Sequence, residues 1–271
     1  MYIERVTLLS DAYPTEDYYP FDLPILRRTR TVPFTRPVTF FVGENGSGKS
    51  TLLEAITRKC GIHVWDKPSR RAGSDNPYEN RLADFIRLTW RGDWVPGSLF
   101  RAETFKELAD FLDDVSRCDP GRLEYQGGEV LSTLSHGEGM LSYLDGRFRR
   151  KGLYFLDEPE AALSPTSQLR LLKLLQDIAV EGIAQFVIAT HSPILLAMPN
   201  AQILSFNGTH IREVRYEETQ HYKLYKQFFT DRDALLKRTD GESGSEGAEA
   251  PRSADWQSGA VQVAEAMLPA D

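Results

Sequence analysis

The residues of this chain that are best suited to chemistry form one short run, GENGSGKST at positions 43–51. It contains the pattern Gly-x4-Gly-Lys-Ser, formed by Gly43, Gly48, Lys49 and Ser50. Glycines let the backbone turn closely around a phosphate, and their amides form an anion site together with those of a helix start. The lysine adds a point charge, and the serine hydroxyl is a hard oxygen that suits Mg²⁺. The run therefore predicts a loop that binds the phosphates of a nucleotide.

The segments on either side of this run fit that prediction. Residues 38–42 are β-branched and aromatic, which indicates a buried strand, and residues 51–59 have apolar side chains at helical spacing. A glycine-rich loop between a strand and a helix is the setting that the pattern requires. We therefore expect nucleotide contacts from the whole loop, namely Gly43, Glu44, Asn45, Gly46, Ser47, Gly48, Lys49, Ser50 and Thr51.

A second run, GLYFLDEPE at 152–160, ends a hydrophobic strand in two adjacent acids. Adjacent carboxylates repel each other, and a nearby Mg²⁺ offsets that repulsion. We predict that Asp157 binds Mg²⁺ together with Ser50, directly or through water. We predict that Glu158 is the general base that polarises the attacking water, a role that typically contributes ~10²–10⁴ in rate.

The run LSHGEG at 134–139 precedes the acidic strand. Here the chain resembles the ABC class of ATPases, whose signature at this point is Leu-Ser-Gly-Gly-Gln. Ser135 and Gly137 match the signature, whereas His136 and Glu138 replace a glycine and the glutamine. The resemblance implies that Ser135, Gly137 and Glu138 bind ATP held by a second protomer. Ser135 and Glu138 also have the spacing of a capping box, so an ordinary helix start is the alternative interpretation.

His191 follows a buried strand in the run QFVIATHSP at 185–193. Ligands of open α/β sheets bind at the carboxyl ends of the strands. In the ABC class a histidine at this place contacts the γ-phosphate, and the resemblance implies that role for His191. The segment 161–168 occupies the aspartate-loop position of the class but lacks the aspartate, and a serine and a proline there predict a helix over about 165–181.

The order of phosphate loop, signature, acidic strand and histidine separates the ABC class from other folds with such a loop. In these runs the chain is similar to a small family of stand-alone bacterial ATPases related to the ABC domains of DNA-repair and chromosome-maintenance proteins. The similarity covers about residues 1–237 and implies an α/β P-loop NTPase fold. We expect a mostly parallel sheet flanked by helices, with an antiparallel β portion and a helical insertion. The resemblance also implies ATP and Mg²⁺ as cofactors, an ATP-dependent homodimer, and catalysis by Lys49, Glu158 and His191.

The resemblance places a helical subdomain at about residues 66–134, where 79–88 and 105–117 have amphipathic helical spacing. Transporter motors of the class carry a glutamine in this region that senses the γ-phosphate, and this chain has no glutamine between its phosphate loop and Tyr125. Arg101 or Glu103 is a candidate substitute. The alternative is an ordinary helix N-terminus with surface charges.

Two further patterns concern the ends of this domain. An aromatic side chain near the N-terminus stacks on adenine in ABC domains, and spacing does not choose among the candidates Tyr13, Tyr18, Tyr19 and Phe21, each of which could instead pack in the core. Towards the C-terminus, 201–206 and 210–216 flank Asn207-Gly208, which predicts a two-residue hairpin turn. Residues 218–238 then predict one or two helices.

Composition limits the remaining possibilities. The net charge is −7, but the segment from Thr239 onward holds seven acidic residues and one arginine, so residues 238–271 are expected to form a disordered acidic tail. Hydrophobic content of 41% supports a sizeable core, and no apolar run is long enough to span a membrane. The chain has two isolated cysteines and no evident secretory signal, so we expect a cytoplasmic protein.

We therefore predict an ABC-class ATPase whose homodimer drives a conformational change in a protein partner or on DNA. Basic clusters at 27–30 and 147–151 could contact nucleic acid, although charged solvated faces have the same pattern. The alternative function is an ATP-gated switch with negligible turnover, in a DNA-repair or phage-defence complex. A transporter motor is disfavoured by the missing glutamine.

Overall fold

The computed structural model describes residues 1–64, 76–118, 121, 123 and 128–236. The chain divides into two compact units, Met1–Lys226 and Gln227–Asp271. The expected acidic tail, 238–271, lies outside the described residues. The account below concerns the first unit, apart from the end of the last helix.

The centre of this unit is a six-stranded sheet with the order β5-β6-β7-β3-β8-β9. Neighbouring strands from β5 to β8 are parallel, and only the short β9 is antiparallel. The residues of β3, β6 and β7 are buried almost throughout, as continuous runs of apolar residues predict for the inner strands of a parallel sheet. The strand bounds are β3 Val38–Val42, β5 Gly97–Arg101, β6 Gly152–Asp157, β7 Ala184–Ala189, β8 Gln202–Ser205 and β9 Arg212–Glu213.

A smaller antiparallel sheet has the order β2-β1-β4, formed by Thr31–Pro33, Ile3–Leu8 and Ile86–Trp90. The helix expected over 79–88 is wrong, because this segment holds a 3₁₀ turn, Arg81–Phe85, followed by β4. The apolar side chains that suggested one helical face serve two purposes instead. Leu82 packs in the core from the turn, and Ile86 does so from a strand that pairs with β1. The described part of the interval 66–134 therefore holds two strands, β4 and β5, before its helix.

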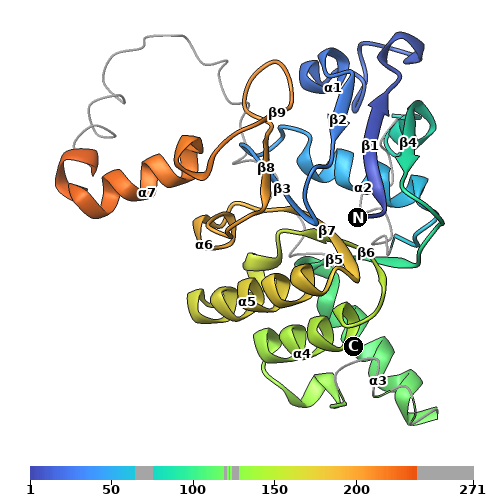
Figure 1. The fold of residues 1–271 in the computed structure, drawn as a ribbon, viewed down its shortest axis with the longest axis vertical. Helices are drawn as coiled ribbons and strands as arrows, with labels where there is room; N and C mark the ends of the chain where they lie inside the picture. The colour runs from blue at the N-terminus through green and yellow to red at the C-terminus, as the bar shows by residue number, and fades with distance from the viewer. Residues whose placement is uncertain (65–75, 119–120, 122, 124–127, 237–271) are drawn as a thin grey trace, which may run out of the picture. The chain divides into compact units, whose positions relative to one another are not determined.

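Helices cover both faces of the large sheet (Figure 1). On one face α2, Lys49–Lys59, packs between the two sheets with its leucines and Ile56 in a core that includes Leu153 and Phe155 of β6. On the other face α4, His136–Phe148, and α5, Pro165–Glu181, pack against Tyr154 and Leu156 of the same strand. Because side chains alternate along β6, one strand supplies both cores.

The remaining helices are α1 Pro24–Arg28, α3 Phe105–Cys118, α6 Pro193–Leu196 and α7 Gln220–Thr230. The helices expected over 105–117 and 165–181 are confirmed as α3 and α5. The hairpin near Asn207-Gly208 is present as β8 and β9, but its turn is longer than two residues because Ser205 pairs with Arg212. The helix expected over 218–238 is α7, followed by a short helical stretch at 232–236. Overall, the structure confirms the expected α/β fold with a mostly parallel sheet and an antiparallel portion.

Two buried glutamines join the sheets to each other. Oε1 of Gln185 on β7 accepts from the backbone N–H groups of Tyr2 (2.6 Å) and Ile3 (2.8 Å), and its Nε2 donates to the carbonyl of Ile3 (2.9 Å). Gln202 on β8 likewise accepts from the N–H of Thr35 (3.1 Å) and donates to the carbonyl of Pro33 (3.2 Å). Each side chain satisfies backbone groups of the smaller sheet or of the residues next to its strands.

Candidate nucleotide-binding and catalytic site

The register of the large sheet brings the predicted site residues to one edge. Arg101 is in register with Asp157, Asp157 with Ala189, and Ala189 with Phe41. These strands are parallel, so the residues that follow them lie in one row at the carboxyl edge. That row holds the loop after β3, the acids that end β6 and His191 after β7.

The loop after β3 has the conformation that its glycines permit. Gly46 has φ +77° and Gly48, which precedes α2, has φ +95°, both in the left-handed region that favours glycine. Gly43 is required for space, since a Cβ there would lie 2.9 Å from Cβ of Phe206 and 3.0 Å from Oδ1 of Asn207. The buried hydroxyl of Ser47 has no hydrogen-bond partner among the described residues. The loop is therefore a close-fitting turn with a polar interior, which suits a phosphate.

Lys49 begins α2 and is only 4% exposed. Its Nζ donates to the carbonyl oxygens of Gly43 (2.7 Å) and Glu44 (2.9 Å), so the ammonium spans the loop and keeps one further N–H. Burial lowers the pKa of Lys49, and the carboxylates of Glu158 and Asp157 oppose that change. The side chain is thus a buried cation beside the two acids of β6.

Ser50 and Asp157 meet directly, because the Oγ of Ser50 donates to Oδ1 of Asp157 at 2.7 Å. Burial raises the pKa of Asp157, while the Ser50 hydroxyl and Arg101 act in the opposite direction. A hydroxyl and a carboxylate side by side are hard oxygen donors, which fits Mg²⁺ rather than a softer ion. These two residues could hold the metal, as the sequence predicts.

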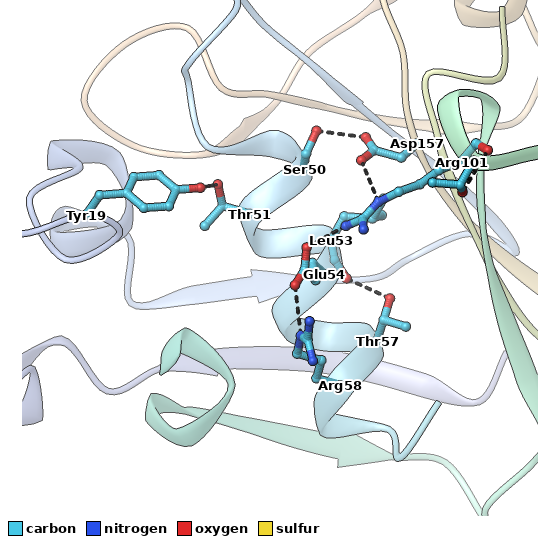
Figure 2. A network of polar contacts seen from close by, with 10 residues as sticks. Tyr19, Ser50, Thr51, Leu53, Glu54, Thr57, Arg58, Arg101 and Asp157 are labelled. Carbon is cyan, nitrogen blue, oxygen red and sulfur yellow. Dashed lines mark hydrogen bonds and ion pairs between the residues drawn. The ribbon is translucent and has the colours of Figure 1, made fainter. Parts of the chain in front are cut away.

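Arg101 joins Asp157 to helix α2 (Figure 2). Its Nε lies 3.5 Å from Oδ2 of Asp157, and its Nη2 donates to Oε2 of Glu54 at 2.5 Å. Glu54 also accepts from Arg58, one turn further along α2 (2.8 Å). Of the two candidates for the missing glutamine, Arg101 is therefore the one seen to contact the acid that ends β6. Both line an open cavity of about 380 Å³, together with Ser50, Asp157 and Glu158.

Glu158 and His191 face each other across the same edge. The Nε2 of His191 lies 3.6 Å from Oε1 of Glu158, whose side chain is 47% exposed. Glu158 has φ +48° and ψ +52°, an uncommon conformation for a residue other than glycine and one associated with functional sites. Its backbone N–H donates to the carbonyl of Ala189 (2.9 Å), which ties this turn to β7. A half-exposed carboxylate in a strained turn can reach a water molecule at the edge of the sheet.

The predicted signature residues form a separate group. Ser135 caps α4, and its hydroxyl donates to Oε2 of Glu138 at 2.6 Å. That contact lowers the pKa of Glu138. Within the described ranges no hydrogen bond or ion pair joins this group to the loop at 43–51. A Cβ on Gly137 would lie 3.2 Å from the carbonyl oxygen of Ala162, so the start of α4 packs against the segment after Glu158.

The four candidate aromatic residues separate by burial. Phe21 is fully buried and Tyr13 packs on it at 4.7 Å between ring centroids, so both belong to the core. Tyr18 and Tyr19 are exposed. The hydroxyl of Tyr19 lies 2.6 Å from Oγ1 of Thr51, which puts it next to the end of the phosphate loop (Figure 2).

Two further residues at this edge were not predicted from the sequence. Glu160 is partly buried, and this burial raises its pKa; its Oε1 accepts from the backbone N–H of His191 at 2.5 Å. His221 of α7 contacts the ring of His191. Glu160 belongs to the run that holds Asp157 and could have been suspected from that proximity. His221 lies 30 residues from its partner, in a helix without a motif.

Two known families match parts of this chain. Residues 21–80 match a family described as "AAA domain", and residues 103–197 match one described as "AAA domain, putative AbiEii toxin, Type IV TA system". The thiamine import ATP-binding protein ThiQ of Ruegeria sp. (strain TM1040) is 29% identical over 163 residues, covering 56% of this chain and 69% of that protein. The aliphatic sulfonates import ATP-binding protein SsuB 2 of Burkholderia lata is 29% identical over 160 residues, covering 55% of each chain.

Solved structures that are similar to this chain include a component of an ABC transporter complex and an SMC head domain. CbiO1 from Clostridium perfringens, part of the ABC transporter complex cbiONQ, is 19% identical with a TM-score of 0.48, covering 89% of this chain and 99% of that one. The SMC head domain from Thermotoga maritima is 16% identical with a TM-score of 0.44, covering 79% and 99%.

A parallel sheet has a glycine-rich loop between β3 and α2, and the carboxylate that ends β6 lies beside Ser50; this combination defines a P-loop NTPase. The order of its motifs and the matches to ATP-binding proteins indicate one class of P-loop NTPase. The chain has the motif order of the ABC class of P-loop ATPases, enzymes that bind and hydrolyse ATP, and it is similar to ATP-binding proteins of import systems. In the part of the chain that the structure describes, no helix is both long and apolar enough to cross a bilayer.

Proposed function

We propose that this protein hydrolyses ATP with Mg²⁺ at the carboxyl edge of the large sheet, as a homodimer that drives a conformational change in a partner. One observation supports this above all: the side chains of Lys49, Ser50, Asp157, Glu158 and His191 converge at that edge. We take residues 1–237 as the ATPase domain, with a helical part within 66–134 and an acidic tail beyond. A cytoplasmic location suits its need for ATP.

Each residue has a distinct role in this proposal. The amides of residues 43–51 and the Lys49 ammonium bind the β- and γ-phosphates, because the loop is tight and the cation is buried within it. Ser50 and Asp157 hold Mg²⁺, which supplies positive charge next to the phosphates. Glu158 accepts a proton from the attacking water, and His191 donates a hydrogen bond to the γ-phosphate from Nε2.

The dimer follows from the exposed signature group. Ser135 and Glu138 are exposed at the start of α4, and Ser135 is a helix N-cap whose neighbouring amides suit an anion. The group has no described polar contact with the loop of its own chain. We infer that it meets the γ-phosphate of ATP bound to a second copy, so that two ATP molecules lie between two protomers.

A trapping experiment tests the proposal. Glu158→Gln removes the base but keeps the shape of the side chain, so we expect an ATP-bound dimer on size-exclusion chromatography with light scattering and little phosphate release. Lys49→Ala in the same background is the matched control and should stay monomeric, because it removes the buried cation that holds the phosphates. A Glu158→Gln protein that remains monomeric at saturating Mg·ATP, and hydrolyses it at the normal rate, would refute both the base and the composite site.

Two measurements identify the kind of partner on which the ATPase acts. Phosphate release measured with and without DNA tests a nucleic-acid partner, and co-purification with an integral membrane protein would favour a transporter role of the kind named in the import relatives. Release that stays near zero under all these conditions would favour the ATP-gated switch.

A further inference from the structure

A second histidine lies against His191 and comes from a distant part of the chain. His221 is in the first turn of α7, and its Nε2 lies 3.2 Å from Nδ1 of His191. The ring centroids are 5.3 Å apart, and the ring planes are inclined by 59°. At this separation the two nitrogens share a hydrogen bond, so one carries a proton and the other accepts it.

The carboxylate on the other side of His191 favours one of the two positions for that proton, and the bond to His221 adds to this preference. Nε2 of His191 lies 3.6 Å from Oε1 of Glu158 and is buried without a hydrogen-bond partner in the described residues. A lone pair at Nε2 would face the carboxylate with like polarity, whereas an N–H there is attracted to it. The favoured arrangement has the His191 proton on Nε2, and Nδ1 accepts the N–H of His221.

The residue next to His221 belongs to a series of contacts that reaches the phosphate loop. The neighbouring Gln220 accepts through Oε1 from Nδ2 of Asn207 at 3.0 Å. Oδ1 of the same Asn207 accepts from the backbone N–H of Glu44 at 2.9 Å. The first turn of α7, which carries His221, is thus tied to the loop through the side chain of Asn207.

We propose that His221 is a positioning residue for ATP hydrolysis, which holds His191 in the tautomer that carries its proton on Nε2. This inference rests on the proposed role of His191 as the group that contacts the γ-phosphate. A histidine fixed in this tautomer meets the phosphate as a hydrogen-bond donor. A histidine that exchanges tautomers or rotates presents a lone pair to the phosphate for part of the time, and that contact is repulsive.

The surrounding charges are compatible with a neutral pair. Burial is the main cause that lowers the pKa of both histidines, and Lys49 adds to the effect on each. Glu44 acts in the opposite direction on both, and Glu158 and Glu160 also face His191. Two charged imidazolium rings would present donors to each other, so the hydrogen bond needs at least one neutral ring.

A spectroscopic experiment tests the tautomer without relying on activity. The full-length protein is labelled with ¹⁵N-histidine, and its five histidines are assigned by single substitutions. Long-range ¹H–¹⁵N correlations are recorded at pH 8 without nucleotide. We expect the wild-type His191 to carry its proton on Nε2, the His221→Leu variant to contain a tautomer mixture, and His221→Gln to resemble wild type because its amide can still donate. A wild-type proton on Nδ1, or an unchanged tautomer in His221→Leu, overturns the proposal.

Steady-state kinetics test the consequence for the reaction. Loss of one positioning hydrogen bond should lower kcat of His221→Leu roughly tenfold, with KM for ATP within about twofold and partial recovery in His221→Gln. His210→Leu, at an exposed histidine, is the matched control and should keep the wild-type kcat. A wild-type kcat in His221→Leu overturns the proposal. Full activity in His191→Gln would instead refute the proposed role of His191, while the spectra still decide the hydrogen bond.

Discussion

The ion pair between Arg101 and Asp157 predicts that replacing Arg101 changes the Mg²⁺ requirement of nucleotide binding. Nε of Arg101 lies 3.5 Å from Oδ2 of Asp157, and the two side chains are only 20% and 12% exposed. Two unit charges at this separation attract each other by about 5 kcal/mol at an effective dielectric constant of about 20. Desolvation and the second partner, Glu54, offset most of this energy, so a net effect of about 1.4 kcal/mol on the Asp157 carboxylate is a reasonable expectation.

The guanidinium and Mg²⁺ compete for the same carboxylate in the proposed site. Arg101→Gln removes the competing charge and keeps a polar side chain of intermediate length. About 1.4 kcal/mol corresponds to a factor of ten, so the Mg²⁺ concentration that gives half-maximal binding of a fluorescent ATP analogue should fall roughly tenfold. If Arg101 also senses the γ-phosphate, as proposed for the missing glutamine, kcat falls in the same variant.

The assay is a Mg²⁺ titration at fixed analogue concentration, which measures binding separately from hydrolysis. Arg58→Gln is the matched control. Arg58 pairs with the same Glu54 at 2.8 Å, and its substitution removes one positive charge, as Arg101→Gln does. We expect it to shift the Mg²⁺ midpoint much less than Arg101→Gln. A midpoint that is unchanged or higher in Arg101→Gln, or an equal shift in both variants, would show that Arg101 does not compete with the metal.

Two further predictions concern stability. Gln185→Leu removes three hydrogen bonds, two of them buried, between β7 and the backbone of Tyr2 and Ile3 at the start of the chain. It leaves these backbone groups unpaired, so the free energy of unfolding in urea should fall by about 2–4 kcal/mol; a loss below about 0.5 kcal/mol would contradict the joining role of this side chain. The lowered pKa values of His191 and His221 mean that the folded protein binds fewer protons there than the unfolded chain, so their contribution to stability is lost as the pH falls through and below about 6.5. Glu160, whose pKa is raised, acts in the opposite direction, so the informative quantity is the wild-type stability minus that of His221→Gln, which should decrease between pH 7.5 and 5.5; a constant difference would refute the linkage.

The sequence predicted which residues meet in the candidate site because they lie at the ends of buried strands or in the loops that follow them. In a parallel sheet all such positions meet at one edge, so a strand pattern and a following polar residue are enough to bring Lys49, Asp157 and His191 together. The order of the motifs along the chain was enough for this prediction, and the order of the strands in the sheet was not needed. The Ser50–Asp157 contact at 2.7 Å is an example of such a meeting across 107 residues.

The segment at 79–88 shows why other parts could not be predicted. Its apolar residues have helical spacing, and a 3₁₀ turn followed by a strand satisfies the same spacing over so short a length. What selects the strand is pairing with β1 from Ile86 to Trp90, which is a property of a distant segment. The His191–His221 contact is hidden for the same reason, because nothing in α7 distinguishes His221 from a surface residue of an amphipathic helix.

The missing aspartate after the acidic strand raises the question of what connects His191 to the signature group. Glu160 accepts from the backbone N–H of His191, and Gln168 joins the same region through Ser192 Oγ (2.5 Å) and the carbonyl of Leu163 (3.0 Å). The segment held by these bonds, Pro159–Ala162, is the one whose last carbonyl packs against Gly137 at the start of α4. A displacement of His191 would therefore act on the signature helix through a chain of direct contacts that includes Glu160. Because the contact of Glu160 is with the backbone of His191, this connection depends on the position of the strand end rather than on a charge at the protein surface.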